Sequence, residues 1–425
     1  MTADQPELSP RARLRQLLTL DLQPLRRREF RLLFIGRAVS LFGSTITMVA
    51  LPFQVYHLTG SSLDVGLLGL FEIVPILLLA IFAGAAADAW DRRRMVLLTE
   101  ASMSLVLVAL IVNGTRPNPQ VWVLFAAAAV FAALDALQGP SLSAILPRLV
   151  PPDELAAATA ITTFYQAPAQ IVGPAVAGII IATAGVTDAY VVDALTFLLG
   201  LIALTLMRAV PPPADAERPS VRRIIEGLRY ARSRPELLGT YLVDIVAMFF
   251  GMPMALFPAL AVRLGGPSVL GALMAAPAVG SLLAAVSSGW TRHIRYQGRA
   301  VIFAATGWGL AIVLFGLSPN LPPALVFLAL AGGADEFSAI FRSTIWNQTI
   351  PDHLRGRLAG IEMISYTVGP AFGNLEAGVA GTLLSLPAAI VSGGVLCVAG
   401  TTSLAFALPR LWSYEASESR GENAA

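Results

Sequence analysis

The stretch FAGAAADAWDRRRM, Phe82–Met95, joins a run of small and apolar residues to a block of fixed positive charge. The run reaches Asp88, and three consecutive arginines follow from Arg92. An apolar segment that ends in arginines is typical of a helix leaving a membrane on its arginine-rich side. A weaker version, SSGWTRHIRYQGRA, begins at Ser287, about 200 residues later. The stretch therefore predicts a membrane protein whose two halves resemble each other.

Composition supports lipid as the main solvent of this chain. Of the 425 residues, 56% are hydrophobic and only 13% are charged, whereas soluble domains carry about 25% charged residues. The net charge of +2 gives no indication of nucleic-acid binding. All 29 basic residues are arginines, which excludes a P-loop ATPase and Schiff-base chemistry because both need lysine.

Metal and cofactor chemistry is not expected. The single cysteine, Cys397, cannot form an internal disulfide, and the three histidines are widely separated. No His/Cys cluster has the spacing of a metal site. We therefore expect no metal and no cofactor, and the loops carry no Ser/His/Asp arrangement that would indicate an enzyme.

Twelve apolar segments are long enough to cross the hydrocarbon core, which takes about 20 residues. They are expected at 31–56, 63–87, 95–114, 121–147, 157–184, 188–208, 238–262, 268–290, 300–318, 323–348, 358–384 and 387–409. We predict an all-helical membrane protein with a tail at 1–30, six-helix bundles at 31–208 and 238–409, a linker at 209–237 and a tail at 410–425. The linker is expected to hold an amphipathic surface helix at Val221–Arg232. The first 30 residues do not have the pattern of a signal peptide.

Arginine placement predicts the orientation of the chain. Arginines cluster before the first expected span, after the second, in the linker, after the eighth and after the tenth, whereas the opposite loops hold only Arg116 and Arg263. Because cytoplasmic loops carry the excess of positive charge, both termini are expected in the cytoplasm. We expect a multi-pass protein of the cytoplasmic (inner) membrane that works as a monomer surrounded by lipid.

Four matches in the same order indicate an internal duplication. Gly84 corresponds to Gly289, and Asp135 to Asp335. PPDELAAATA matches PDHLRGRLAG, and GPAVAG from Gly173 matches GPAFGN from Gly369. Paired helical repeats of this kind are typical of secondary transporters.

The first stretch resembles the loop motif between helices 2 and 3 of the major facilitator superfamily, which reads Gly, three residues, Asp, Arg, one residue, Gly, Arg, Arg. Gly84, Asp88, Arg92 and Arg93 match this motif, while Ala89 and Asp91 depart from it. An acid before the arginines is common in the drug and siderophore exporter branch. The resemblance implies twelve helices in two six-helix repeats and a gating role for the four matching residues.

Further stretches resemble the same branch. GPAVAG resembles the antiporter motif of proton-coupled exporters, with Gly173, Pro174 and Gly178 matching its core and Ala169 standing where glycine is usual. YLVDIVAMFFGMPMALFPALAV and APAVGSLLAAVSSGW resemble the enterobactin exporter group. The motif implies export, whereas close helix packing by small residues would explain the same glycines without it.

Acids near the middle of expected spans are candidates for proton coupling, because a charge at that depth costs at least about 2.5–3.5 kcal/mol. In order of preference they are Glu72, Asp135, Asp335 and Glu336, with Arg37 and Arg342 as counter-charges. An acid whose partner changes between two states can load and release a proton. The alternative is that acid–arginine pairs only fix helix packing. That structural interpretation is favoured for Glu100, Asp193, Asp244 and Glu362, which lie nearer the expected helix ends.

Asp88 has two interpretations as well. It can form a latch with a cation or a helix N-terminus of the other half, or it can be a solvated helix end beside arginines that only set topology. A substrate cavity is expected between the halves near the midplane. Its candidate residues are Tyr165, Gln166, Gln170, Met248, Phe250, Met252 and Met254. Packing or lipid contact is the alternative for these side chains.

The sequence thus favours a proton-driven exporter of a small organic molecule of the siderophore type. A multidrug or antibiotic efflux pump of the same fold is the first alternative. A membrane enzyme or a sensor is the second, and it lacks support because the loops are short and no soluble signalling domain is attached. No nucleic-acid partner is expected.

Overall fold

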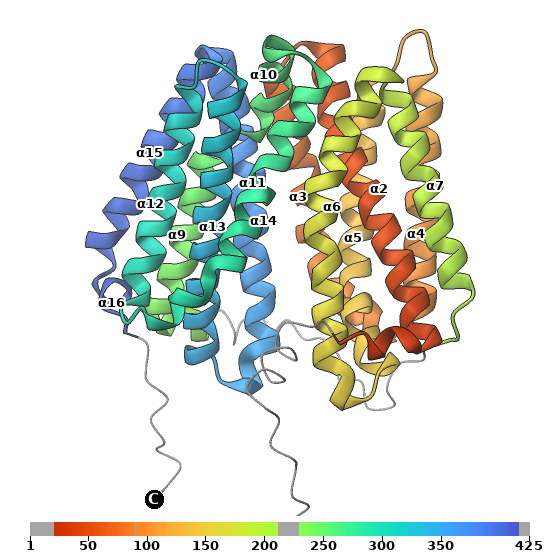
Figure 1. Ribbon diagram of the computed structural model, residues 1–425, viewed down its shortest axis with the longest axis horizontal. Coiled ribbons are helices and arrows are strands. Elements are labelled where there is room, and N and C mark those ends of the chain that lie inside the picture. The colour runs from red at the N-terminus through yellow and green to blue at the C-terminus, as the bar shows by residue number, and fades with distance from the viewer. Residues whose placement is uncertain (1–20, 90, 211–228, 416–425) are drawn as a thin grey trace, which may run out of the picture.

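The computed structural model describes residues 21–89, 91–210 and 229–415. Every regular element in this part of the chain is a helix, and the helices stand side by side in two bundles (Figure 1). Residues 1–20 of the expected tail at 1–30, residues 416–425 of the expected tail at 410–425 and most of the expected surface helix at Val221–Arg232 lie outside the described residues.

Six long helices form the first half of the chain. Its elements are η1 Gln23–Arg26, α2 Arg28–Thr59, α3 Ser62–Ala89, α4 Arg92–Gly114, α5 Val121–Leu149, η2 Pro152–Glu154, α6 Leu155–Thr183 and α7 Val186–Thr205. Glycines end helices where the chain must turn sharply: Gly60 after α2 has φ 68° and Gly185 before α7 has φ 102°, a region of φ that glycine adopts without strain.

The second half repeats this plan with one interrupted helix. Its elements are α9 Pro235–Gly251, η3 Met254–Leu256, α10 Phe257–Leu264, α11 Pro267–Ser287, η4 Ser288–His293, α12 Gln297–Gly316, α13 Leu321–Thr349, α14 Asp352–Leu383, α15 Leu386–Ala407 and α16 Pro409–Trp412. Gly251, Pro253 and Pro258 predict a break in the seventh expected span, and α9 does end at Gly251. Trp308 of α12 donates its indole N–H to the Gly251 carbonyl (3.0 Å), which satisfies an acceptor freed by the break.

The composition of the helices fits a membrane. Eleven helical segments of the described residues are long and apolar enough to cross a membrane. The remaining expected span, at 358–384, corresponds to α14, which has 32 residues but is not among those eleven. Large apolar side chains are exposed on the outside of the bundles, for example Leu105, Val286 and Phe406. Side chains of this kind belong in lipid, where helices also satisfy their own backbone hydrogen bonds. The chain is therefore a multi-span integral membrane protein.

Helix packing repeats between the halves. In the first half the packed pairs are α2 with α6 and α7, α3 with α5, and α4 with α5 and α7. In the second half they are α9 with α14 and α15, α11 with α13, and α12 with α13 and α15. These are the same five pairs when each helix is replaced by its counterpart six spans later. The packing therefore agrees with the duplication predicted from sequence.

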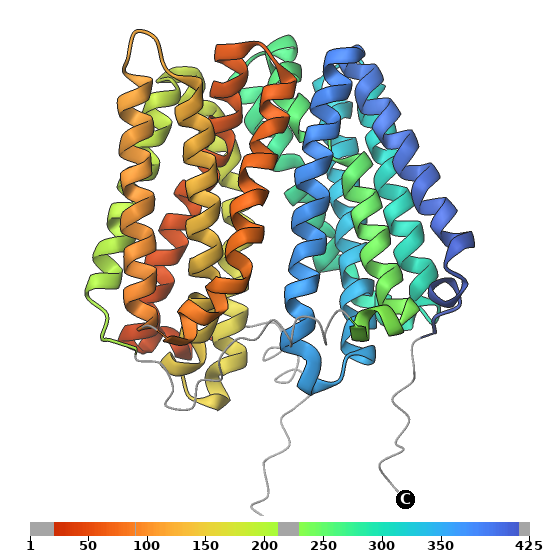
Figure 2. The ribbon, with the colours of Figure 1, turned by 180° about the vertical axis from the view of Figure 1, so that it is seen from behind.

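The halves meet through two equivalent crossings, α3 with α14 and α6 with α11. Glycines bring the backbones together there. A Cβ added at Gly178 would lie 2.7 Å from the Pro267 carbonyl oxygen, and one added at Gly69 would lie 2.9 Å from that of Ala371. These contacts lie towards the end of the molecule that carries the turns at Gly60 and Gly185, at the top of Figures 1 and 2. We call this the sealed end. The described chain termini lie at the other end, the open end.

We expect Gly178→Val to weaken the seal. The new Cβ would meet backbone atoms of Pro267, Ser268 and Gly271 at 2.7–3.1 Å, and backbone cannot move aside as a flexible side chain can. A reporter cysteine, Ser44→Cys, should then react several-fold faster than it does without the Gly178→Val substitution. The thiol reagent is membrane-impermeant and is added outside whole cells, where the sealed end is expected to face. The native Cys397 is buried, so the reporter dominates the signal.

Gly139→Val is the matched control, because a Cβ at Gly139 meets nothing within 4 Å. Equal labelling of the Gly178→Val and Gly139→Val proteins would show that the glycine crossing does not hold the seal.

Candidate functional site

A cavity of about 520 Å³ lies where the two halves meet. Helices α2, α3 and α5 form most of its wall, and η3, α11 and α14 contribute from the second half. Its polar lining includes Arg37, Ser44, Glu72, Asp135 and Asn374. The apolar lining is rich in flexible side chains and consists of Leu41, Met48, Leu51, Pro52, Val65, Leu68, Ile76, Met103, Ala128, Phe131, Ala132, Phe197, Met254, Ala255 and Met274. A mostly apolar cavity with a few polar groups suits an amphipathic small molecule.

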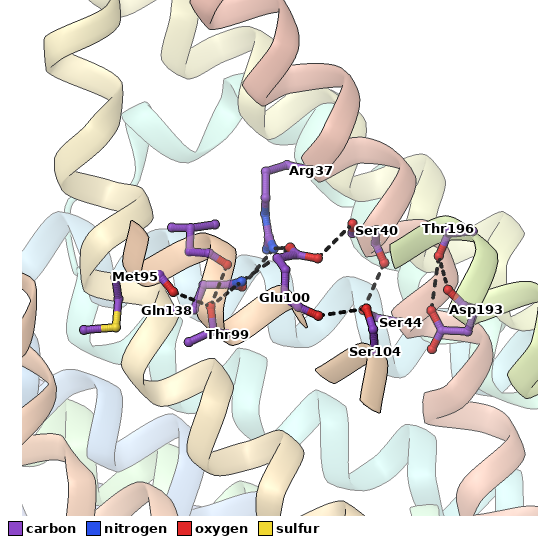
Figure 3. A network of polar contacts seen from close by, with 11 residues as sticks. Arg37, Ser40, Ser44, Met95, Thr99, Glu100, Ser104, Gln138, Asp193 and Thr196 are labelled. Carbon is purple, nitrogen blue, oxygen red and sulfur yellow. Dashed lines mark hydrogen bonds and ion pairs between the residues drawn. The ribbon is translucent and has the colours of Figure 1, made fainter. Parts of the chain in front are cut away.

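A buried polar network lies against this cavity (Figure 3). The Arg37 guanidinium on α2 donates to Glu100 on α4 (2.9 Å) and to Gln138 on α5 (2.8 Å). Gln138 donates in turn to the Thr99 hydroxyl (3.0 Å), and Ser40 donates to Glu100 (3.2 Å). The Glu100 side chain is fully buried, while 20% of the Arg37 side chain is exposed. The network therefore joins three helices and leaves one edge of Arg37 at the cavity.

A second buried acid lies beside the network. Asp193 on α7 accepts hydrogen bonds from Thr47 on α2 and from Thr196 (3.2 Å). Figure 3 shows Asp193 and Thr196 close together, beyond Ser40 and Ser44 as seen from Arg37. Hydrogen bonds from hydroxyls compensate a buried carboxyl for lost water, and these bonds fix α7 against α2.

Glu72 and Asp135 differ from these acids because they line the cavity without a bonded partner. Neither forms a hydrogen bond or an ion pair with any described residue. Both side chains are exposed to the cavity. The charge of Arg37 acts on Asp135, whereas Glu72 lies among apolar side chains. Two acids without a bonded partner among the described residues thus line the cavity from two neighbouring helices, α3 and α5.

The second half contains a comparable cluster with the charges exchanged between helices. Arg342 on α13 forms an ion pair with Asp244 on α9 and lies 3.8 Å from Asp335. The Ser365 hydroxyl donates to Asp244 (3.4 Å). The first helix of the first half carries the arginine, whereas the first helix of the second half carries the acid. Glu336 is partly buried and forms no ion pair or hydrogen bond with the described residues.

The arginines of the loop motif anchor helix ends. Arg93 donates to the carbonyl oxygens of Leu204 (2.9 Å) and Thr205 (2.6 Å) at the end of α7, where the helix dipole favours a cation. Arg92 is buried and donates to the Ala144 carbonyl (3.2 Å). Gly84 and Asp88 belong to α3, but their side chains lie outside the described residues. The gating role stays a prediction.

The glycines of the antiporter-type motif pack helix against helix. Gly173 lies against Thr45 of α2, and Gly178 lies against the start of α11. Pro174 is inside α6, and its carbonyl lies over Gly271. These residues thus tie α6 to its own bundle and to the opposite one.

Of the expected cavity residues, Met254 lines the cavity. Met248 is buried beneath Gly369, and Phe250 and Met252 pack against the core. Tyr165 packs edge-on against Phe34 (5.4 Å between ring centroids) and lies within the field of Arg37. Gln166 and Gln170 are exposed on α6, away from the lining.

The structure also identifies partners that the sequence does not specify. Arg37 pairs with Glu100, and Arg342 pairs with Asp244; such acid–arginine pairs agree with the packing interpretation favoured for these two acids. Met48, Met103 and Met274 join Met254 in the lining. The polar residues Thr99 and Ser104 on either side of Glu100 are the feature of the sequence that could have indicated a buried polar network on α4.

Two helical bundles, a glycine-tightened seal and a central cavity between the halves define a transporter of the major facilitator superfamily. The chain matches the transmembrane secretion effector family over residues 19–423, and it belongs to that family.

Relatives and solved structures agree with this class. The chain is 26% identical to enterobactin exporter EntS of Citrobacter koseri over 373 residues, 87% of this chain and 90% of the relative. It is also 26% identical to EntS of Escherichia coli over 377 residues, 88% and 91% of the two chains. A bacterial homologue of the iron transporter ferroportin, solved in an inward-facing state, has the same fold with a TM-score of 0.68 at 16% identity, covering 91% of this chain and 99% of that one.

Proposed function

We propose that this protein exports a small amphipathic molecule of the siderophore class in exchange for protons. The observation that carries the proposal is the pair of unbonded acids, Glu72 and Asp135, in a cavity between the two halves. A carboxylate in a cavity can take up a proton from one side and release it to the other when the halves rock. The proton gradient would then supply the driving force without a bound cofactor.

Alternating access requires a second state with the seal open. In the present state the glycine crossings close the sealed end. With both termini in the cytoplasm, as arginine placement indicates, the open end faces the cytoplasm, and α14 also crosses the membrane, which makes twelve spans in all. The protein in this state would be ready to load substrate from inside the cell. Separation of α3 from α14 and of α6 from α11 would expose the cavity to the outside.

The substrate class rests on the cavity and on the relatives. The relatives are named enterobactin exporters. Arg37 at the cavity edge offers a charged donor to an acidic or phenolic oxygen, and apolar side chains surround it. A broad drug exporter is the second candidate, because four methionines in the lining can repack around different ligands.

Deletion of the gene tests the substrate. Under iron limitation, we expect a siderophore to accumulate inside the deletion strain several-fold above the complemented parent, as quantified by mass spectrometry of cells and medium. Equal export by both strains would remove the siderophore class. Increased sensitivity of the same deletion strain to a panel of amphipathic drugs would then favour the second candidate.

A further inference from the structure

A second cavity, of about 590 Å³, lies on the outside of the second bundle near the open end. Helices α11 and α12 both pack along α13, yet they barely touch each other. The cavity is a groove along α12 and α13, bordered by η4 and the residues that follow it. Small residues make its floor hollow: Ala300, Ala304 and Gly307 on α12 face Ala334 on α13. A Cβ at Gly307 would meet only the Ala334 Cβ, at 3.8 Å, so the floor has unused room.

Aromatic rings form the walls of the groove. Trp290 of η4 contacts Phe337 and Phe341 of α13, with ring centroids 5.1 and 6.2 Å apart. Phe303 stands on the opposite side against Trp412 (5.7 Å). Trp290 and Phe303 remain 47% and 64% exposed. Exposed tryptophan and phenylalanine near a helix end are typical of the membrane–water interface.

Basic groups gather at the mouth of the groove. Arg299 donates through Nε to the Trp412 carbonyl (3.3 Å), and its guanidinium lies over the Tyr296 ring (4.2 Å to the centroid). Arg295 forms an ion pair with Glu415 (2.8 Å). His293 lines the mouth, and Arg292 is exposed beside it. Among the described residues Glu415 balances one arginine, so this part of the mouth has an excess of positive charge while the floor is apolar.

This division matches an amphiphile whose head is anionic. From Arg299 to Gly307 the groove follows α12 over a rise of about 12 Å, which is the length of part of an acyl chain. Basic pockets between transmembrane helices bind the head groups of anionic lipids. A soluble anion would use the arginines but would leave the hollow apolar floor empty.

We propose that this groove, formed by η4, α12 and α13, binds one anionic phospholipid from the leaflet at the open end. The head group lies between Arg295 and Arg299, and an acyl chain lies along Ala304 and Gly307 against the aromatic walls. The bound lipid fills the groove along α12 and α13, and so it supports the second bundle at the end where the halves must move.

Native mass spectrometry of the purified full-length protein tests this site. The protein is equilibrated with an equimolar mixture of phosphatidylglycerol and phosphatidylcholine. We expect at least fivefold preferential retention of phosphatidylglycerol by the wild type. The double variant Arg295→Gln/Arg299→Gln should lower that preference to near unity. The control Arg116→Gln/Arg263→Gln removes two arginines from the sealed end and should retain it.

Loss of Arg299 could disturb α16, because Arg299 donates to the Trp412 carbonyl. A second variant that leaves both arginines in place therefore tests the same groove. Gly307→Leu fills the floor without altering any charge and should reduce retained phosphatidylglycerol at least fivefold, whereas Gly139→Leu in open space on α5 should not. Equal retention of the two lipids by the wild type, or retention unchanged in both groove variants, would overturn the proposal. So would displacement of the lipid by inorganic phosphate, or a stoichiometric protein that co-purifies with the wild type and not with these variants.

Discussion

Replacement of Glu72 by glutamine is expected to abolish transport driven by a pH gradient, with a loss of at least about tenfold. Glutamine keeps the size and hydrogen-bonding capacity of the side chain but cannot bind and release a proton at physiological pH. Glu72 lines the cavity and has no counter-charge among the described residues that would hold it ionised. It is therefore the acid best placed to respond to a change of access.

Two assays on the Glu72→Gln protein in proteoliposomes separate coupling from folding. Uptake driven by a pH gradient should be lost, whereas exchange of labelled for unlabelled substrate, which needs no net proton movement, should persist. Asp135→Asn should behave in the same way if the two acids share the proton. Glu154→Gln is the matched control, because Glu154 lies in η2, outside the cavity, in an ion pair with Arg27 (2.7 Å). Normal coupling in both single variants and in the double variant would remove these acids from the mechanism.

Replacement of Arg37 by methionine is expected to destabilise the first bundle. The Glu100 side chain is fully buried and would lose its counter-charge, and removal of one partner from a buried ion pair costs about 3–5 kcal/mol. The Gln138 side-chain oxygen would also lose the hydrogen bond that Arg37 donates to it. We expect thermal unfolding in detergent to occur several degrees lower, and the cavity to lose its cationic edge.

A second substitution distinguishes charge from packing. In Arg37→Met/Glu100→Gln no unpaired charge remains, so most of the lost stability should return, although transport should not. Arg263→Met, at an exposed arginine of α10, is the control for loss of one arginine. An unchanged unfolding temperature in Arg37→Met, or a double variant no more stable than Arg37→Met, would show that the network does not hold the bundle together.

The helices and the duplication could be predicted from the sequence because both leave long, repeated signals. An apolar run of about 20 residues rarely forms anything other than a membrane-spanning helix. The equivalence of Asp135 and Asp335 is one of four matches that follow the same order in both halves, about 200 residues apart. Glu72 and Asp135 also stood out, since a charge within an apolar run is rare. Span limits were less certain: α4 begins at Arg92, three residues before the expected start, which places Glu100 two turns inside the helix.

Side-chain partners could not be predicted in the same way. Arg37 and Glu100 are 63 residues apart on different helices, and their pairing depends on how each helix is rotated about its axis. The break after Gly251 decides which methionines face the cavity, so Met254 lines it while Met248 is buried. In the sequence, Met103 and Met274 cannot be told apart from methionines that face lipid. Only the packing of the two halves shows that they line the cavity.

Accumulation of substrate by wild-type protein in acid-loaded proteoliposomes is the most direct test of proton exchange. The substrate is the metabolite that the deletion strain retains. With one proton exchanged per neutral molecule, a lumen two pH units more acidic than the medium should support up to about 100-fold accumulation, and an ionophore that collapses the gradient should abolish it. Uptake that does not depend on the pH gradient, or that requires an alkaline lumen, would contradict proton antiport.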